Sequence, residues 1–372
     1  MIVELVVEKV VSHGEGLARY NNEVVFISDV LPGEHITVEL REEKKGLYRG
    51  TLLSIDKPSS HRVTPPCPYY GVCGGCDFQY VESSYQVELK EEIVKENLKR
   101  IGKVDYRYTF LPSEVDHPWA YRHRVKFHRD EQSGAIGFLG RKSHTVIDIA
   151  SCPILVENLN RLLSEKREIL QQQRSSTIEV LSNQRELSFD DTTIPFYLNG
   201  KTIYGSGNLF FQSHASLIEP MIDFVQRHTE GDHIVDLYSG VGMFAAFVES
   251  ADNNVVAVER DKKALNVAKK NLSYTTFFTQ KSESWARSHS LAQCDTLIVD
   301  PPRVGIDNKV IQAIGKLQPK KIIYVSCNSA TLARDIHRLR AYGYVAEVVQ
   351  LFDLYPQTTH VETIVLMSRV KT

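Results

Sequence analysis

The sequence lacks any long apolar run. None of its 372 residues belong to a stretch approaching the roughly 18–20 apolar residues that a membrane-spanning helix needs. The N-terminus, MIVELVVEKVV, alternates acidic and apolar residues and lacks the basic start and apolar core of a secretory signal. We therefore expect a cytoplasmic protein with no membrane partner, and nothing in the sequence predicts an obligate protein partner.

The sequence also lacks an excess of basic charge. Its formal net charge is −2, so the chain as a whole is not a generally basic nucleic-acid-binding protein. One segment differs, because YRHRVKFHR at 121–129 contains no acid. Arg122, Arg124 and Lys126 fall on alternate positions there, which predicts a strand with one basic face. That face is either simply solvated or contacts phosphate.

Cysteine is scarce, with six in the chain, and a disulfide framework is not expected in a cytosolic protein of this size. Four of the six suit a zinc ion or an iron–sulfur cluster: Cys67, Cys73 and Cys76 in a glycine-rich loop, and Cys152 further on. The prolines after Cys67 and Cys152 favour the cluster. A radical-type site is disfavoured by the five-residue gap after Cys67 and by the fourth cysteine, so we expect a structural role.

The order of predicted elements divides the chain into three regions, without internal repeats. Short strands separated by turn residues at 1–56 predict a small OB-like barrel, a fold that often grips oligonucleotides. Region 57–205 is expected to be an α+β domain whose helix at 82–102 packs on the C-terminal domain. Strands and helices alternate at 206–372, which predicts a doubly wound, Rossmann-like α/β domain.

The stretch IVDLYSGVGMFA contains the first strand-to-helix turn of that α/β domain. Gly240 and Gly242 allow a tight turn and close approach of a ligand, and Glu259 ends the next strand, where it suits ribose hydroxyls. An adenosine-containing cofactor is expected, either a dinucleotide or S-adenosylmethionine. Asp236 and Asp300 at strand ends favour S-adenosylmethionine, because acids suit a sulfonium and an amino group better than a pyrophosphate.

A cysteine and a glutamate complete the candidate catalytic set. Cys327 follows the apolar strand IIYVS, and Glu362 stands before the last apolar strand. A thiolate that adds to C6 of uracil makes C5 nucleophilic enough to take a methyl group, and a base must then remove the C5 proton. We predict Cys327 as the nucleophile and Glu362 as the base. Cys294, before a strand at the opposite end of the sheet, is expected to be inert.

The motifs DLYSGVGMF, DPPRVGID, YVSCNSATLARD and QTTHVETI together resemble those of the RNA uracil-5-methyltransferases, and the resemblance covers essentially the whole chain. It implies that the N-terminal barrel is a TRAM-like RNA-binding module and that the four clustered cysteines hold a 4Fe–4S cluster. It also implies the roles of nucleophile for Cys327 and proton acceptor for Glu362. Contacts to S-adenosylmethionine are implied for Gln212, Tyr238, Glu259 and Asp300. Two residues depart from the family pattern: Ser239 stands where the family commonly has cysteine, and Met243 stands where a polar residue is often found.

The expected substrate is a looped or flipped uridine in RNA, because C5 and C6 are inaccessible in a stacked base. The barrel and the clustered cysteines favour the 23S ribosomal RNA branch of the family over the transfer RNA branch. A cytosine-5 RNA methyltransferase is a rival, although such enzymes usually have a cysteine in the loop that contains Arg303 here. An adenine-N6 enzyme would usually have an aromatic residue there. A non-catalytic RNA-binding assembly factor is the remaining alternative.

Overall fold

The computed structural model describes residues 1–288 and 294–370, and the chain forms two compact units. The first unit comprises 1–96, 138–147 and 355–360, and the second contains the rest of the chain. The domain boundaries predicted after residues 56 and 205 stay predictions. Within the described residues, no helix is both long and apolar enough to span a bilayer.

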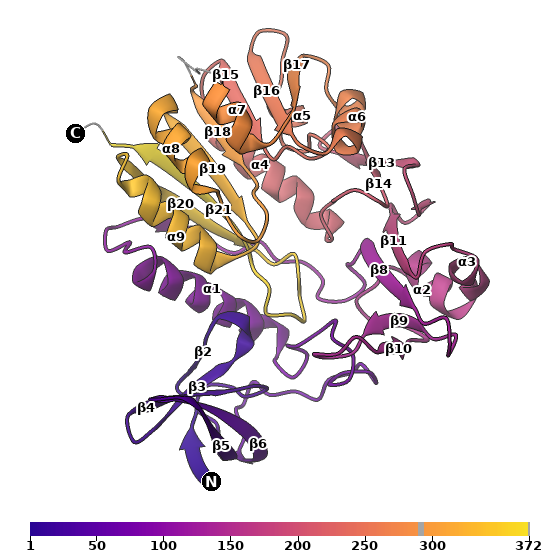
Figure 1. Ribbon diagram of the computed structural model, residues 1–372, viewed down its shortest axis with the longest axis vertical. Helices are drawn as coiled ribbons and strands as arrows, with labels where there is room; N and C mark the ends of the chain where they lie inside the picture. Colours follow the sequence, from indigo (N-terminus) through magenta and orange to yellow (C-terminus); the bar gives the residue numbers. More distant parts are fainter. Residues whose placement is uncertain (289–293, 371–372) are drawn as a thin grey trace. The chain divides into compact units, whose positions relative to one another are not determined.

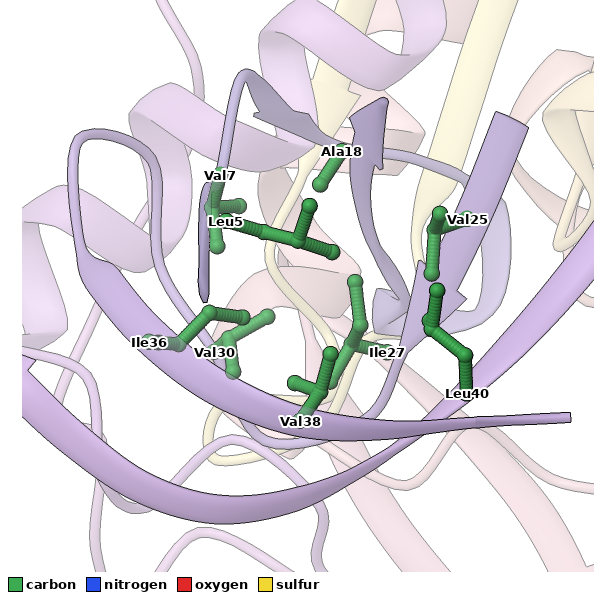
Figure 2. Close-up of a cluster of buried hydrophobic side chains, with 9 residues drawn as sticks. All are labelled: Leu5, Val7, Ala18, Val25, Ile27, Val30, Ile36, Val38 and Leu40. Carbon is green, nitrogen blue, oxygen red and sulfur yellow. The ribbon is translucent and has the colours of Figure 1, made fainter. Parts of the chain in front are cut away.

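The N-terminal part of the first unit is a curled six-stranded sheet with the order β1-β5-β6-β4-β3-β2. Alternate residues of its strands point into one apolar core, which Figure 2 shows enclosed by the long curved ribbons of β5 and β6. Register shifts in the β5–β6 pair let these long strands bend. The OB-like fold expected for this region is confirmed. The strands are β1 Ile2–Val6, β2 Lys9–Val10, β3 Gly16–Tyr20, β4 Glu23–Ile27, β5 His35–Lys44 and β6 Leu47–Lys57.

The first unit also contains the cysteine loop and most of helix α1 (Ser83–Arg100), close to the bounds expected from the sequence. The segment 355–360 of the same unit is bound to this region by a dense set of hydrogen bonds. Asp77 accepts from the backbone N–H and the hydroxyl of Thr359, at 2.8 and 3.0 Å. The amide side chain of Gln86 bonds to the backbone N–H and the side chain of Gln357, at 2.9 and 3.1 Å.

Along the sequence from residue 124 to residue 206, the chain forms short strands and two small helices. In the second unit β8 pairs antiparallel with β11, and β13 pairs with β14 as a hairpin. The segment 153–173 contains two short helices, α2 and α3. The elements are β8 Arg124–Arg129, β9 Ile136–Leu139, β10 Val146–Asp148, α2 Glu157–Ser164, α3 Arg167–Gln171, β11 Thr177–Ser182, β12 Leu187–Ser188, β13 Thr193–Leu198 and β14 Lys201–Ser206.

An eight-stranded sheet forms the core of the second unit, in the order β17-β16-β15-β18-β19-β21-β20-β7. Its first five strands are parallel and β21 runs antiparallel between β19 and β20. Helices α7, α8 and α9 lie next to one another along one face, in the foreground of Figure 1. The predicted Rossmann-like fold is thus confirmed. The strands are β7 Thr109–Phe110, β15 His233–Leu237, β16 Asn254–Glu259, β17 Thr275–Thr279, β18 Thr296–Val299, β19 Lys321–Ser326, β20 Tyr344–Phe352 and β21 Glu362–Arg369, and the helices are α4 Ile218–His228, α5 Ala245–Val248, α6 Lys262–Asn271, α7 Ser282–Ser288, α8 Asn308–Leu317 and α9 Ser329–Arg340.

Candidate active site

The turn after β15 has the backbone that a ligand-binding loop needs. Tyr238 has φ 63°, a left-handed conformation that is unfavourable for a residue with a side chain. Gly242 has φ 79°, and a Cβ on it would lie 2.5 Å from Leu272, so only glycine fits. Gly240, with φ 55°, faces open space. The loop therefore combines tight packing at Gly242 with room for a ligand beside Gly240.

Glu259, the last residue of β16, lies beside this loop. One carboxylate oxygen accepts a hydrogen bond from the Gly240 N–H at 3.0 Å, and the other accepts from the Asp261 N–H at 2.8 Å. These two bonds fix the carboxylate at the edge of the sheet. A carboxylate has lone pairs to spare after two such bonds, so it can still accept from the hydroxyls of a ribose.

Several buried polar groups of the second unit, some of them in or just before this loop, have no hydrogen-bond partner within the described residues. They are Oε1 of Gln212, both carboxylate oxygens of Asp236 and the hydroxyl of Ser239. Burial raises the pKa of Asp236 well above its usual value, and the charge of Asp300 adds to the rise. The Ala245 N–H opposes that rise, but no described donor reaches either oxygen in hydrogen-bonding geometry. Buried polar groups are normally satisfied, so these orphaned atoms fit a polar, cationic ligand such as S-adenosylmethionine.

Cys327 and Glu362 are brought together by the antiparallel register of β19 and β21. Ser326 pairs with Thr363. This is the last pair of the ladder, and Cys327 directly follows Ser326 while Glu362 directly precedes Thr363, so the antiparallel course of the strands leaves the two residues next to each other just beyond it. Glu362 is the first residue of β21 rather than a residue before that strand, as the sequence had suggested, and it is 3% exposed. The two candidate catalytic groups are thus cross-strand neighbours.

The acidic groups at this edge have strongly raised proton affinity. Burial raises the pKa of Glu362 well above its usual value, and the neighbouring Asp300 raises it further. Asp300 follows β18 and keeps some exposure, yet it lies deep enough that burial raises its pKa to about 7. Two carboxyl groups in one low-dielectric site cannot both ionise cheaply. The pair therefore holds a proton at neutral pH more readily than isolated carboxyl groups do.

Arg303 joins this group, although the sequence analysis did not predict it as a site residue. Its side chain donates a hydrogen bond to the Cys327 sulfur, and its charge lowers the pKa of Glu362. Its backbone oxygen accepts from the Thr331 hydroxyl at 3.1 Å and from the Asn328 amide at 3.3 Å. The start of α9 therefore holds the DPPR loop in place. The sequence feature that could have identified Arg303 as a site residue is its place in the DPPR motif, directly after the strand that ends before Asp300.

The thiol of Cys327 is not activated by its surroundings alone. Burial raises its pKa to about 11, Glu362 and Asp300 act in the same direction, and Arg303 acts against them. At pH 7 only ~1 such thiol in 10⁴ is ionised. A thiolate forms here more readily when the proton shared by the acids stays in place or when further positive charge enters the site. Cys294 is different: it is buried before β18, away from these strand ends, and burial raises its pKa to about 12.

Within the part of the chain that the structure describes, none of the four clustered cysteines forms a disulfide. The Gly75 N–H donates to the Cys73 sulfur at 3.4 Å, and Cys67 acts electrostatically on that thiol. Cys152 belongs to the second unit. Within residues 1–288 and 294–370, no group of three or more histidine, cysteine or acidic side chains is arranged to hold a metal ion. The structure therefore does not support the predicted 4Fe–4S site.

The predicted basic strand face exists, but its charge is partly neutralised. His123 and Phe127 are buried while Lys126 is exposed on the opposite face of β8. Arg124 and Lys126 both pair with Glu179 of β11, at 2.8 and 2.6 Å. The segment 121–129 gives no sign of Glu179 in the sequence, because that residue lies far along the chain on β11.

Comparison with known proteins agrees with the geometry. A family model described as tRNA (Uracil-5-)-methyltransferase matches residues 287–370, and a methyltransferase small-domain model matches 218–317. The 23S rRNA (uracil(1939)-C(5))-methyltransferase RlmD of Shewanella woodyi is 30% identical over 98% of this chain and 95% of its own. An RNA methyltransferase of Thermotoga maritima is also 30% identical, over 99% of both chains.

A solved structure shares the fold. The tRNA (uracil-54, C5)-methyltransferase of Pyrococcus abyssi, in complex with S-adenosyl-L-homocysteine, has a TM-score of 0.77 and 22% identity. The match covers 98% of this chain and 100% of that one. Fold and site thus define an S-adenosylmethionine-dependent methyltransferase with a Rossmann-like domain. The chain belongs to the RNA uracil-C5-methyltransferase family, and its activity is methylation of C5 of uracil in RNA.

Proposed function

We propose that the methylation proceeds through a covalent adduct between Cys327 and C6 of the target uridine. The observation that supports it is that Cys327 and Glu362 lie side by side just beyond the last pair of the β19–β21 ladder, with Arg303 hydrogen-bonded to the sulfur. A nucleophile, a base and a cation at one sheet edge match the three needs of this reaction. The thiol must lose a proton, the ring must accept the sulfur, and the C5 proton must be removed.

Each residue has a defined task in this proposal. Arg303 stabilises the thiolate of Cys327 by a charge-assisted hydrogen bond. The thiolate forms a bond to C6, and the electron pair of the C5–C6 double bond moves toward the O4 carbonyl, which gives an enolate. S-adenosylmethionine supplies the methyl group that C5 takes. Glu362 then removes the C5 proton, the double bond re-forms, and the sulfur leaves.

The cofactor contacts are proposed to come from the loop and strand ends described above. The orphaned oxygens of Gln212 and Asp236 and the hydroxyl of Ser239 support this assignment. Glu259, fixed by two backbone N–H groups, is proposed to bind the ribose hydroxyls. Further contacts are proposed from Tyr238, Gly240 and Gly242 in the turn after β15. Asp300, which follows the neighbouring strand β18, is proposed as another.

For the substrate, we propose 23S ribosomal RNA. The full-length relative at 30% identity is named for that RNA, whereas the tRNA-modifying enzyme of Pyrococcus abyssi is 22% identical. Transfer RNA is the alternative, because the family model carries that name. The test is to incubate purified ribosomal RNA and transfer RNA separately with enzyme and methyl-labelled S-adenosylmethionine. Label in 5-methyluridine from the ribosomal RNA alone supports the proposal, and label from transfer RNA alone refutes it.

We also propose, on the sequence pattern, that Cys67, Cys73, Cys76 and Cys152 hold a 4Fe–4S cluster. Three of these cysteines lie within one glycine-rich loop, and Cys73 accepts a backbone N–H bond of the kind that stabilises cluster sulfurs, which supports the proposal. No catalytic step depends on it. Protein purified without oxygen should be brown and contain iron. Colourless protein with stoichiometric zinc would refute the proposal.

A further inference from the structure

The first unit contains a cavity of about 550 Å³ that the methylation chemistry does not use. Its walls come from the loop after β4, from the proline-rich linker after β6, and from the cysteine loop. Its size falls in the range of roughly 300–1,000 Å³ that small-molecule sites occupy. Two tyrosines line it, Tyr70 and Tyr80, with ring centroids 6.5 Å apart.

The charged groups of the cavity wall are already paired. Arg62 donates to both carboxylate oxygens of Glu34, at 2.6 and 2.8 Å, and its guanidinium lies 4.7 Å from the centre of the Tyr80 ring. Asp29 is held by two parallel bonds from Arg141, at 2.8 and 2.9 Å. Each cation is thus matched by one carboxylate, so the site offers no excess positive charge for a phosphate.

The tyrosines are fixed in orientation. Tyr70 donates its hydroxyl to the Asp77 carbonyl at 3.1 Å, and Tyr80 donates to the Val30 carbonyl at 3.4 Å. Both hydroxyls therefore already donate hydrogen bonds within the protein. The part of Tyr70 that can contact a ligand in the cavity is its aromatic ring. A preformed aromatic wall beside neutral polar groups suits a flat, uncharged, hydrogen-bonding ligand.

We propose that this cavity binds an unpaired nucleobase of the RNA substrate, at a nucleotide other than the methylated uridine. Any base can stack on an aromatic ring. The Thr64 hydroxyl and the Asp29–Arg141 pair of the cavity wall can add polar contacts to the edge of that base. The binding energy of this second base helps to offset the cost of unstacking the target. The inference rests on RNA being the substrate.

The test uses the shortest transcript that the wild-type enzyme methylates. In a series of such transcripts, each nucleotide around the target is made abasic in turn. One position should raise KM by about five- to tenfold, the loss expected for one base–aromatic stack, with kcat within about twofold. Tyr70→Ala should raise KM by a similar factor with the intact transcript and by no further factor with that abasic transcript. Tyr70→Phe should behave as wild type.

A second pair of variants guards against a folding defect in Tyr70→Ala. Thr64 is exposed, so Thr64→Trp should fill the cavity without disturbing the core, and KM should rise by a similar factor. Val370→Trp puts the same ring on an exposed position beyond the end of β21, outside both the barrel and the cavity, and should leave KM unchanged. A normal KM for Thr64→Trp, or equal effects of Tyr70→Ala on intact and abasic RNA, would overturn the proposal. Wild-type methylation of the same transcript is measured first, so failure of the proposed function is seen separately.

Discussion

Cys327 and Glu362 lie next to each other at adjoining ends of β19 and β21, because each is the first residue beyond Ser326–Thr363, the last pair of the antiparallel ladder, and Glu362 acts electrostatically on the thiol. This relationship places a buried carboxyl group with raised proton affinity next to the thiol that must become a nucleophile. Glu362 makes the resting thiolate less stable, but once ionised it is a strong base for the C5 proton. Arg303 opposes this destabilisation of the thiolate through its hydrogen bond to the sulfur.

The contribution of Arg303 can be measured from the pH dependence of the reaction. The fraction of Cys327 thiolate rises with pH below its pKa of about 11, so kcat/KM should increase from pH 6 to 9. Arg303→Gln removes the positive charge that lowers this pKa. The rising limb should then move to higher pH by about one unit, since an adjacent opposite charge shifts a pKa by 1–3 units. Over this pH range such a shift lowers the rate about tenfold at every pH, so alkylation of Cys327 by iodoacetamide at pH 8, which reports the thiolate fraction, is measured beside it and should slow by a similar factor. An unchanged alkylation rate with slower methylation would show that Arg303 does not act on the thiol.

Glu362→Gln tests the proposed base separately from the nucleophile. The amide cannot take the C5 proton, so methyl transfer occurs but release of the sulfur is slowed by about 10²-fold or more. A methylated enzyme–RNA adduct should therefore accumulate and be visible as a band resistant to denaturing electrophoresis. Glu347→Gln, an exposed substitution on β20, serves as the control and should show turnover like wild type. A Glu362→Gln enzyme that turns over normally would remove Glu362 from the mechanism.

Asp236 predicts a pH dependence of stability in the ligand-free protein. Its pKa in the folded state lies above the unfolded value, so the folded state retains a proton that the unfolded state releases. The contribution of this protonated carboxyl to the free energy of unfolding is fully present below the pKa of the unfolded state. It is lost as pH rises toward the pKa of the folded state, by at most about 1.4 kcal/mol per pH unit for one group. Tm should be lower at pH 8 than at pH 6, and Asp236→Asn should reduce that difference.

The control for this measurement is Asp252→Asn, an exposed carboxyl whose removal should leave the pH dependence of Tm unchanged. Asp300 and Glu362 remain in the Asp236→Asn protein and leave part of the slope, because burial raises the pKa of both. The same variant should lose affinity for S-adenosylmethionine in calorimetric titration. A slope identical to that of wild type would contradict the raised pKa of Asp236.

The sequence predicted the sheet, the glycine turn and Cys327 because these depend on short-range patterns. An apolar strand that ends in a turn, and glycines at positions with positive φ, can be recognised within a dozen residues. The contact of Arg303 with Cys327 depends on the neighbouring positions of β18 and β19 in the sheet, which the sequence alone does not provide. The same holds for the exposed face of β8, where Glu179 lies on a separate strand.

The cavity of the first unit is a similar case. Its walls come from three loops, and each loop by itself is typical of a linker or a turn. The ion pairs of Arg62 and Arg141 become visible only in three dimensions.

The covalent adduct at Cys327 is tested most directly by trapping it with RNA that contains 5-fluorouridine, in which C5 has no proton to remove. After incubation with S-adenosylmethionine, the complex is digested with nuclease and protease and the peptides are analysed by mass spectrometry. We predict a methylated fluorouridine nucleotide on the peptide that contains Cys327, none in Cys327→Ala, and an unchanged adduct in Cys294→Ala. An adduct on another residue, or 5-methyluridine formed by Cys327→Ala at the wild-type rate, would contradict the account.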